Sequence, residues 1–208
     1  MSLNIVIAPI SGSFFVNQIG AYKNLLEYDF NPDIFLGASG GIIGIMLLAC
    51  SGNNVNGLLS VSKNLNSSYL IKKWNSFLPA FFMSFFKGSF YQHSGVHHQI
   101  MKIIGTPGLM KEKEIWFHCF NIGKGRTSLY CTSNENNSFL RANDCEIFLT
   151  DVYYADGDLN IISDAILASA AVPPLMPSIN LNEQPHYDGG LSFATPFLLL
   201  KFKNKDIV

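Results

Sequence analysis

Asp33-Ile-Phe-Leu-Gly37-Ala38-Ser39-Gly40-Gly41-Ile-Ile-Gly44 is the stretch of sequence that decides the fold. An apolar run leads up to Ser39, and an almost wholly apolar run of helical length, residues 41–50, follows it. A helix that is hydrophobic on all sides is a buried one. The stretch therefore predicts a buried strand, a glycine-rich turn and a buried helix, in that order.

The residues before this stretch repeat the same alternation. Leu3 to Ala8 is a short apolar run that predicts a strand, and residues 17–28 carry apolar side chains at helical spacing. Pro32 ends this helix, and Asp33 to Gly37 forms the second strand. The order strand, helix, strand, helix implies right-handed crossovers and a parallel sheet.

The second half of the chain adds a hairpin, a helix and a glycine turn. Residues 115–121 and 127–132 predict paired strands, and residues 163–171 predict a helix with Ser163 as its N-cap. A short segment, residues 185–187, then leads into Asp188-Gly189-Gly190. With no repeat and no linker in the sequence, we expect one domain over residues 1–208.

Composition excludes several classes of protein. Of the 208 residues, 48% are hydrophobic and 14% charged, which excludes intrinsic disorder. The net charge of -1 comes without a basic stripe, so we expect no nucleic-acid partner. The spacing of the four cysteines is not that of metal ligands, and their pattern indicates reduced thiols. We expect neither a metal nor another cofactor.

The turn around Ser39 has the spacing of a catalytic serine turn. In Gly-x-Ser-x-Gly the serine sits on a sharp strand-to-helix turn, and glycines two residues away on each side, Gly37 and Gly41, leave room for it. The N-terminal pole of the helix favours negative charge developing beside Ser39. The alternative is that this common pentapeptide only opens a glycine-rich helix.

A nucleophilic serine needs a base, and the sequence offers two kinds. Histidine is the usual choice, but His118 lies inside a predicted strand and reads as a core residue. His93 and His97 have the spacing of two metal ligands on one helix face, but no third ligand lies nearby. His186 is a minor candidate for the base. The other kind is the Asp188 carboxylate, which can approach a serine hydroxyl closely on a tight glycine turn and would be more basic in an apolar site. The alternative is a common Asp-Gly turn at the surface.

Three motifs follow one another along the chain: Gly37-Ala-Ser39-Gly-Gly41, Ala168-Ser-Ala-Ala-Val-Pro173-Pro-Leu-Met-Pro177 and Tyr187-Asp188-Gly189-Gly190. Together and in this order they resemble the patatin-like phospholipase family. The resemblance implies a three-layer α/β sandwich with a mostly parallel central sheet and helices on both faces. It also implies a lipid acyl hydrolase in which Ser39 is the nucleophile, Asp188 is its only side-chain partner, and the reaction passes through an acyl-enzyme.

The sequence departs from the family pattern in the loop after the first strand. Relatives carry three glycines there, whose N–H groups form the oxyanion hole, and only Gly12 remains in this chain. We expect the N–H donors to come from Ser11, Gly12, Ser13 and Gly40. The altered loop keeps two alternatives open: an inactive patatin-fold binding module at a membrane surface, and an acyltransferase. Relatives also continue past Pro196, so truncation at the C-terminus stays open.

Partners and location follow from the same reading. The resemblance implies a phospholipid or another acyl-ester lipid as substrate. The first residues lack the basic start of a signal peptide, so we expect a cytoplasmic protein, with peripheral contact to a membrane left open. Residues 77–90 hold six Phe and a single charge, Lys87, and fit either a core helix or an apolar cap that meets lipid.

Overall fold

The structure is a computed structural model, and it describes residues 5–8, 15–52, 54–63, 72–73, 89, 91–92, 94–105, 113–138 and 150–192. Ser11, Gly12 and Ser13 of the expected oxyanion loop lie outside the described residues. So does the phenylalanine-rich segment 77–90 except for Ser89, and the proposed lipid cap therefore stays a prediction.

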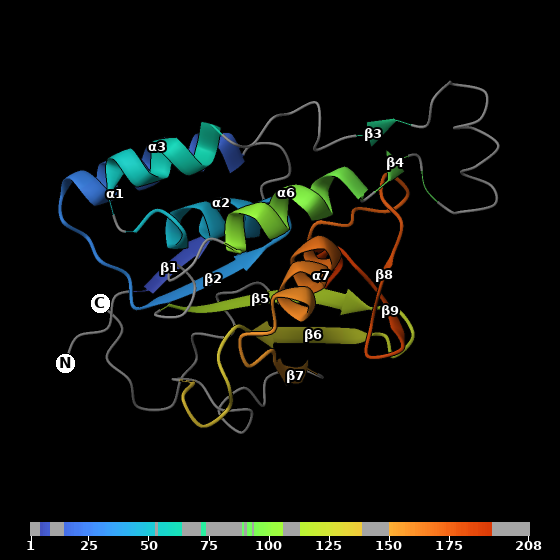
Figure 1. Cartoon of the computed structure of the whole chain (residues 1–208). Coiled ribbons are helices and arrows are strands. Elements are labelled where there is room, and N and C mark those ends of the chain that lie inside the picture. Colours follow the sequence, from blue (N-terminus) through green and yellow to red (C-terminus); the bar gives the residue numbers. More distant parts are fainter. Residues whose placement is uncertain are drawn as a thin grey trace.

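Among the described residues, seven strands form one open sheet with the main path β1-β2-β5-β6-β7 (Figure 1). Neighbours on this path run parallel except for the β5–β6 hairpin, so the strands are mostly parallel. A separate small sheet pairs β3 with β4. The strands of the main path are β1 (Ile5–Ala8), β2 (Ile34–Ala38), β5 (Glu114–Asn121), β6 (Arg126–Cys131) and β7 (Thr150–Tyr154). The others are β3 (Lys72–Lys73), β4 (Tyr91–Gln92), β8 (Ile179–Leu181) and β9 (Gln184–Tyr187).

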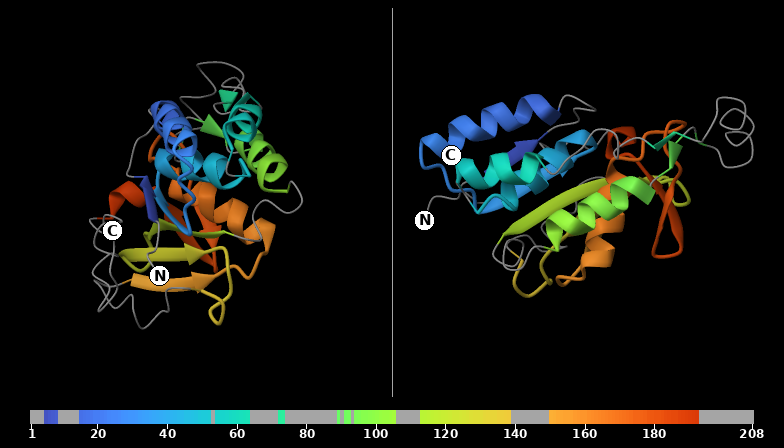
Figure 2. Two further views of the ribbon diagram at one scale, coloured as in Figure 1. Left: turned by 90° about the vertical axis from the view of Figure 1, so that its left-hand side faces the viewer. Right: turned by 45° about the horizontal axis from the view of Figure 1, so that its top comes forward.

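The described helices pack in one hydrophobic core against one face of the sheet. They are α1 (Phe15–Glu27), α2 (Gly40–Ala49), α3 (Val55–Lys63), α6 (Ser94–Ile104) and α7 (Leu159–Ser169). Helix α2 lies on β1 and β2, with α1 and α3 outside it, while α7 lies on β5 (Figure 2). All ten residues of α2 are buried, which explains its uniformly apolar sequence.

The opposite face of the sheet carries a smaller apolar cluster. Its buried residues come from the strands and centre on Trp116. The predicted class, an α/β fold with a mostly parallel sheet, is confirmed. Helical cover over this second face stays a prediction, because the described helices all pack on the first.

One expected detail of α7 is wrong. The helix begins four residues before Ser163, and its N-cap is Asp158, whose Oδ1 accepts hydrogen bonds from the amides of Asn160 and Ile161 at 2.8 and 3.3 Å. A carboxylate at this position satisfies amides that the helix itself leaves free. Ser163 is instead a fully buried residue within the helix, and its Oγ has no hydrogen-bond partner among the described residues.

The edge of β5 brings distant segments together. Strand β2 runs parallel to β5 and ends where Ala38 pairs with His118. Strand β9 runs antiparallel to β5, pairing Tyr187 with Phe120, and so approaches from the opposite direction. Figure 1 shows β2 and β9 beside β5. Because these two strands approach each other along the same edge of β5, the residues that follow them, Ser39 and Asp188, come together next to His118 and Phe120.

Candidate active site

Ser39 is held on a strained turn between β2 and α2. Its backbone has φ 55° and ψ −137°, a conformation that residues with a side chain rarely adopt. A Cβ on Gly37 would lie 3.0 Å from Cα of Ile42, so a glycine lets the strand approach the first turn of the helix closely. The Ser39 side chain makes no capping hydrogen bond to α2, which leaves its hydroxyl available for another partner.

That partner is Asp188. The Ser39 hydroxyl donates a hydrogen bond to Oδ2 of Asp188 at 2.7 Å, although the two residues are 149 positions apart. The other carboxylate oxygen accepts the Gly190 N–H at 2.6 Å. Only 2% of Ser39 and 4% of Asp188 are exposed. The structure thus brings together the serine and the carboxylate that the sequence analysis singled out.

Burial raises the pKa of Asp188 above its ordinary value, and the hydrogen bonds from Ser39 and Gly190 only partly oppose this. A carboxylate with a raised pKa is a better proton acceptor than one in water. The arrangement can therefore withdraw the proton from a serine hydroxyl, which is the chemical requirement for making serine nucleophilic.

Gly189 allows Asp188 to come this close to β5. A Cβ on Gly189 would lie only 2.3 Å from the backbone oxygen of His118, a separation that real side chains do not adopt. The His118 ring also faces this glycine, with Nε2 3.1 Å from the Gly189 carbonyl oxygen. Since a carbonyl only accepts, Nε2 of His118 carries the proton.

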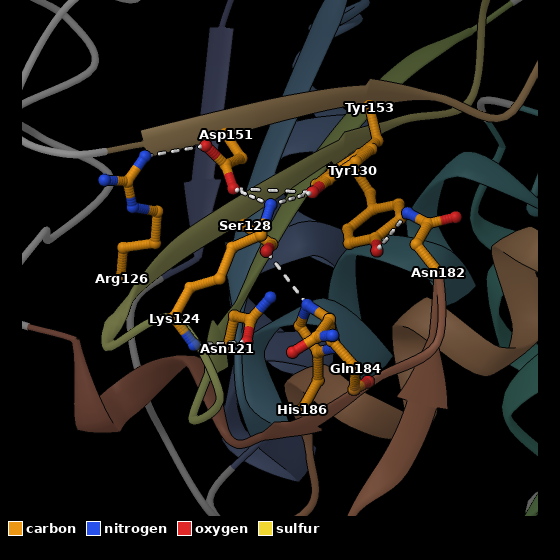
Figure 3. Close-up of polar contacts among 10 residues, drawn as sticks. All are labelled: Asn121, Lys124, Arg126, Ser128, Tyr130, Asp151, Tyr153, Asn182, Gln184 and His186. Carbon is orange, nitrogen blue, oxygen red and sulfur yellow. Dashed lines mark hydrogen bonds and ion pairs between the residues drawn. The ribbon is translucent and has the colours of Figure 1, made fainter.

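The two described histidines near the turn, His118 and His186, form hydrogen bonds with residues other than Ser39. Burial lowers the pKa of His118 to about 4, so its ring is neutral at neutral pH and its Nε2 proton goes to Gly189, as expected for a core residue. His186 accepts from the Ser128 hydroxyl at 2.9 Å and donates from Nδ1 to the Gln184 carbonyl at 2.8 Å (Figure 3). The side chain of His186, the minor candidate, is therefore occupied elsewhere.

The His186 pair belongs to a polar network around the β5–β6 hairpin. Partial burial raises the pKa of Asp151, but hydrogen bonds from Lys124 and Arg126 outweigh it and bring that pKa below its ordinary value (Figure 3). In the same view Tyr130 accepts a hydrogen bond from Asn182. These contacts fix β6, β7 and the β8–β9 segment, the last of which leads directly to Asp188.

The expected oxyanion donors are placed only in part. Gly40 is the first residue of α2, where backbone amides have no partner within the helix, so its N–H is a candidate donor. The Ser39 N–H is not free for this task, because it donates to Oγ of Ser169 at 3.1 Å. The glycines Gly41, Gly189 and Gly190 line the same two turns as Ser39 and Asp188.

Ser169 is a site residue that the sequence analysis did not identify. It lies within the Ala168–Pro177 motif, but nothing in a serine near the end of an apolar helix indicates a partner 130 positions away.

Among the described residues, no group of three or more His, Cys, Asp or Glu side chains could hold a metal ion. Within the same residues, no helix combines the length and the apolar character needed to cross a membrane.

The sequence profile of the family described as Patatin-like phospholipase matches residues 12–201. The chain belongs to the patatin-like phospholipase family. No curated protein matches it. Membership in this family supports an acyl hydrolase that acts on lipids. The three motifs, the Ser39 turn and the strands of the main sheet other than β1 fall within the matched residues.

Proposed function

We propose that this patatin-like protein hydrolyses acyl esters of phospholipids or related lipids with Ser39 as nucleophile and Asp188 as its base. The observation that carries the proposal is the 2.7 Å hydrogen bond from the Ser39 hydroxyl to Oδ2 of Asp188 in a nearly fully buried setting. Family membership supports the lipid substrate. The buried carboxylate supports a mechanism without histidine, because both described histidines nearby have other partners.

The first half of the reaction forms an acyl-enzyme. Oγ of Ser39 attacks the ester carbonyl carbon while its proton passes to Asp188, and a tetrahedral intermediate with a negatively charged oxygen results. In this proposal the N–H of Gly40, the first residue of α2, donates to that oxygen. Asp188 then returns its proton to the leaving alkoxide as the ester C–O bond breaks.

The second half repeats these steps with water. A water molecule gives its proton to Asp188 and attacks the acyl carbon, and the collapse of the new intermediate returns the proton to Ser39 and releases a fatty acid. An alcohol in place of water would give the acyltransferase reaction, in which the same dyad passes the acyl group to a second lipid.

A fluorophosphonate probe tests the proposal directly, because it reacts with an activated serine. The wild-type protein should be labelled and should cleave a p-nitrophenyl acyl ester, whereas Ser39→Ala should lose both properties. Asp188→Asn should lose nearly all turnover, and the double variant should be no slower than the single ones, since the two residues act as a unit. The control is Ser163→Ala, which removes a buried hydroxyl without a hydrogen-bond partner in the part of the chain that the structure describes.

The pattern of labelling separates the alternatives. Full labelling of Ser39→Ala would refute the nucleophile assignment. A wild-type protein that folds, binds liposomes of phosphatidylcholine and is never labelled would instead be an inactive binding module. Transfer of a labelled acyl chain to added monoacylglycerol, in preference to release of fatty acid, would identify an acyltransferase.

A further inference from the structure

Ser169, the last residue of α7, links the Ser39 turn to the central strand. Its fully buried hydroxyl accepts the Ser39 N–H at 3.1 Å and donates to the backbone oxygen of His118 at 2.7 Å. The three residues belong to three different elements, the β2–α2 turn, α7 and β5. One side chain therefore fixes the nucleophile turn against both a helix and a strand.

The direction of these hydrogen bonds matters. The His118 carbonyl can only accept, so the Ser169 proton points to it and a lone pair of Ser169 is left facing the Ser39 amide. A buried backbone N–H without an acceptor is costly, and the turn at Ser39 is already strained at φ 55°. The hydrogen bond to Ser169 thus stabilises the orientation of the Ser39 peptide against the backbone strain of the turn.

His118 connects the same contact to the other half of the site. Its backbone oxygen accepts from Ser169, which holds Ser39, and its ring Nε2 donates to the Gly189 carbonyl, next to Asp188. Ser39 and Asp188 are therefore both positioned relative to one residue of β5. These two links hold the two turns whose side chains make the 2.7 Å contact.

We propose that Ser169 is a positioning residue for the reaction: by accepting the Ser39 N–H, it aims the Ser39 hydroxyl at Asp188 and leaves the Gly40 N–H to face the developing oxyanion. The inference rests on the proposed function of Ser39 and Asp188. It assigns a role to a residue that contacts neither the substrate nor the reacting oxygen. Its loss should slow the chemical step while substrate binding is kept.

The test compares Ser169→Ala, Ser169→Thr and Ser163→Ala with the wild type. The substitutions Ser169→Ala and Ser163→Ala both remove one hydroxyl from α7, but only the first removes an acceptor for Ser39. Turnover of a p-nitrophenyl ester is measured per active site, with the sites counted by fluorophosphonate labelling. Thermal melting and the rate of labelling are recorded for each variant.

For Ser169→Ala we expect kcat and the labelling rate to fall by about 10- to 100-fold, with KM within about twofold of wild type, because a misplaced reacting group costs rate rather than binding. Ser169→Thr keeps the hydroxyl and should recover most of the loss. Ser163→Ala should match the wild type in kcat.

Three results would overturn the inference. The first is a wild-type kcat per active site in folded Ser169→Ala, and the second is an equal loss in Ser163→Ala. The third is a Ser169→Thr variant that folds with the wild-type melting temperature and stays as slow as Ser169→Ala. Each differs from failure of the proposed function, which would appear as activity and labelling retained in Ser39→Ala.

Discussion

Replacing Gly189 with alanine tests whether the close approach of the Asp188 turn to β5 sets the rate. The added Cβ would lie 2.3 Å from the backbone oxygen of His118 and 2.8 Å from Cδ2 of its ring. To reach even the shortest tolerated separation, the turn must move by about 0.7 Å. The backbone of β5 cannot yield easily, because its strand is paired on both edges. The displacement therefore falls on Asp188 and lengthens its hydrogen bond to Ser39.

A shift of this size predicts a fall in kcat of about 100-fold and a loss of about 1–3 kcal/mol in the free energy of unfolding. Ester hydrolysis per labelled site and urea unfolding measure the two effects. The matched control is Gly20→Ala in α1, where an added Cβ meets no atom of the described residues within 4 Å. That variant should keep its activity and gain up to about 1 kcal/mol in stability. A Gly189→Ala protein with wild-type kcat and unchanged stability would refute the reasoning.

Three further predictions concern the same site. Ser39→Gly should be more stable than Ser39→Ala by about 1 kcal/mol in urea unfolding, because glycine adopts φ 55° without strain, and equal stabilities would argue against a strained turn. Burial raises the pKa of Asp188, so between the pKa of the unfolded chain and the higher pKa of the folded chain only the folded chain keeps the proton. The free energy of unfolding therefore falls as pH rises through this range. The melting temperature of Asp188→Asn should therefore gain on wild type between acid and neutral pH, and a constant difference would contradict the raised pKa. His186→Asn should lower the melting temperature by breaking the contact with Ser128 but leave fluorophosphonate labelling of Ser39 in place; a loss of labelling equal to that of Asp188→Asn would restore a role for this histidine.

The local structure around Ser39 was predictable because its causes lie within a dozen residues. The apolar run before the serine, the glycines beside it and the apolar run after it are read directly from the chain, and β2, the turn and α2 follow them within one residue. The β5–β6 hairpin was predicted for the same reason, from adjacent strands around a glycine turn. The N-cap of α7 was wrong because both Ser163 and Asp158 are residue types that cap helices, and the burial that places Ser163 inside the helix is not visible in sequence.

The sequence alone was therefore enough to identify Ser39 and Asp188 as candidate site residues, whereas the contacts at the site were decided by the tertiary structure. The glycine turn at residues 188–190 marks Asp188 as a candidate, but only the antiparallel approach of β9 to the edge that β2 leaves unpaired brings its carboxylate to Ser39. The link from Ser39 through Ser169 to His118 likewise requires α7 to lie on β5, with its last residue at the end of β2. The physical reason is that turns and helices follow from neighbouring residues, whereas a hydrogen bond between residues 149 apart exists only after the sheet has fixed where each segment ends.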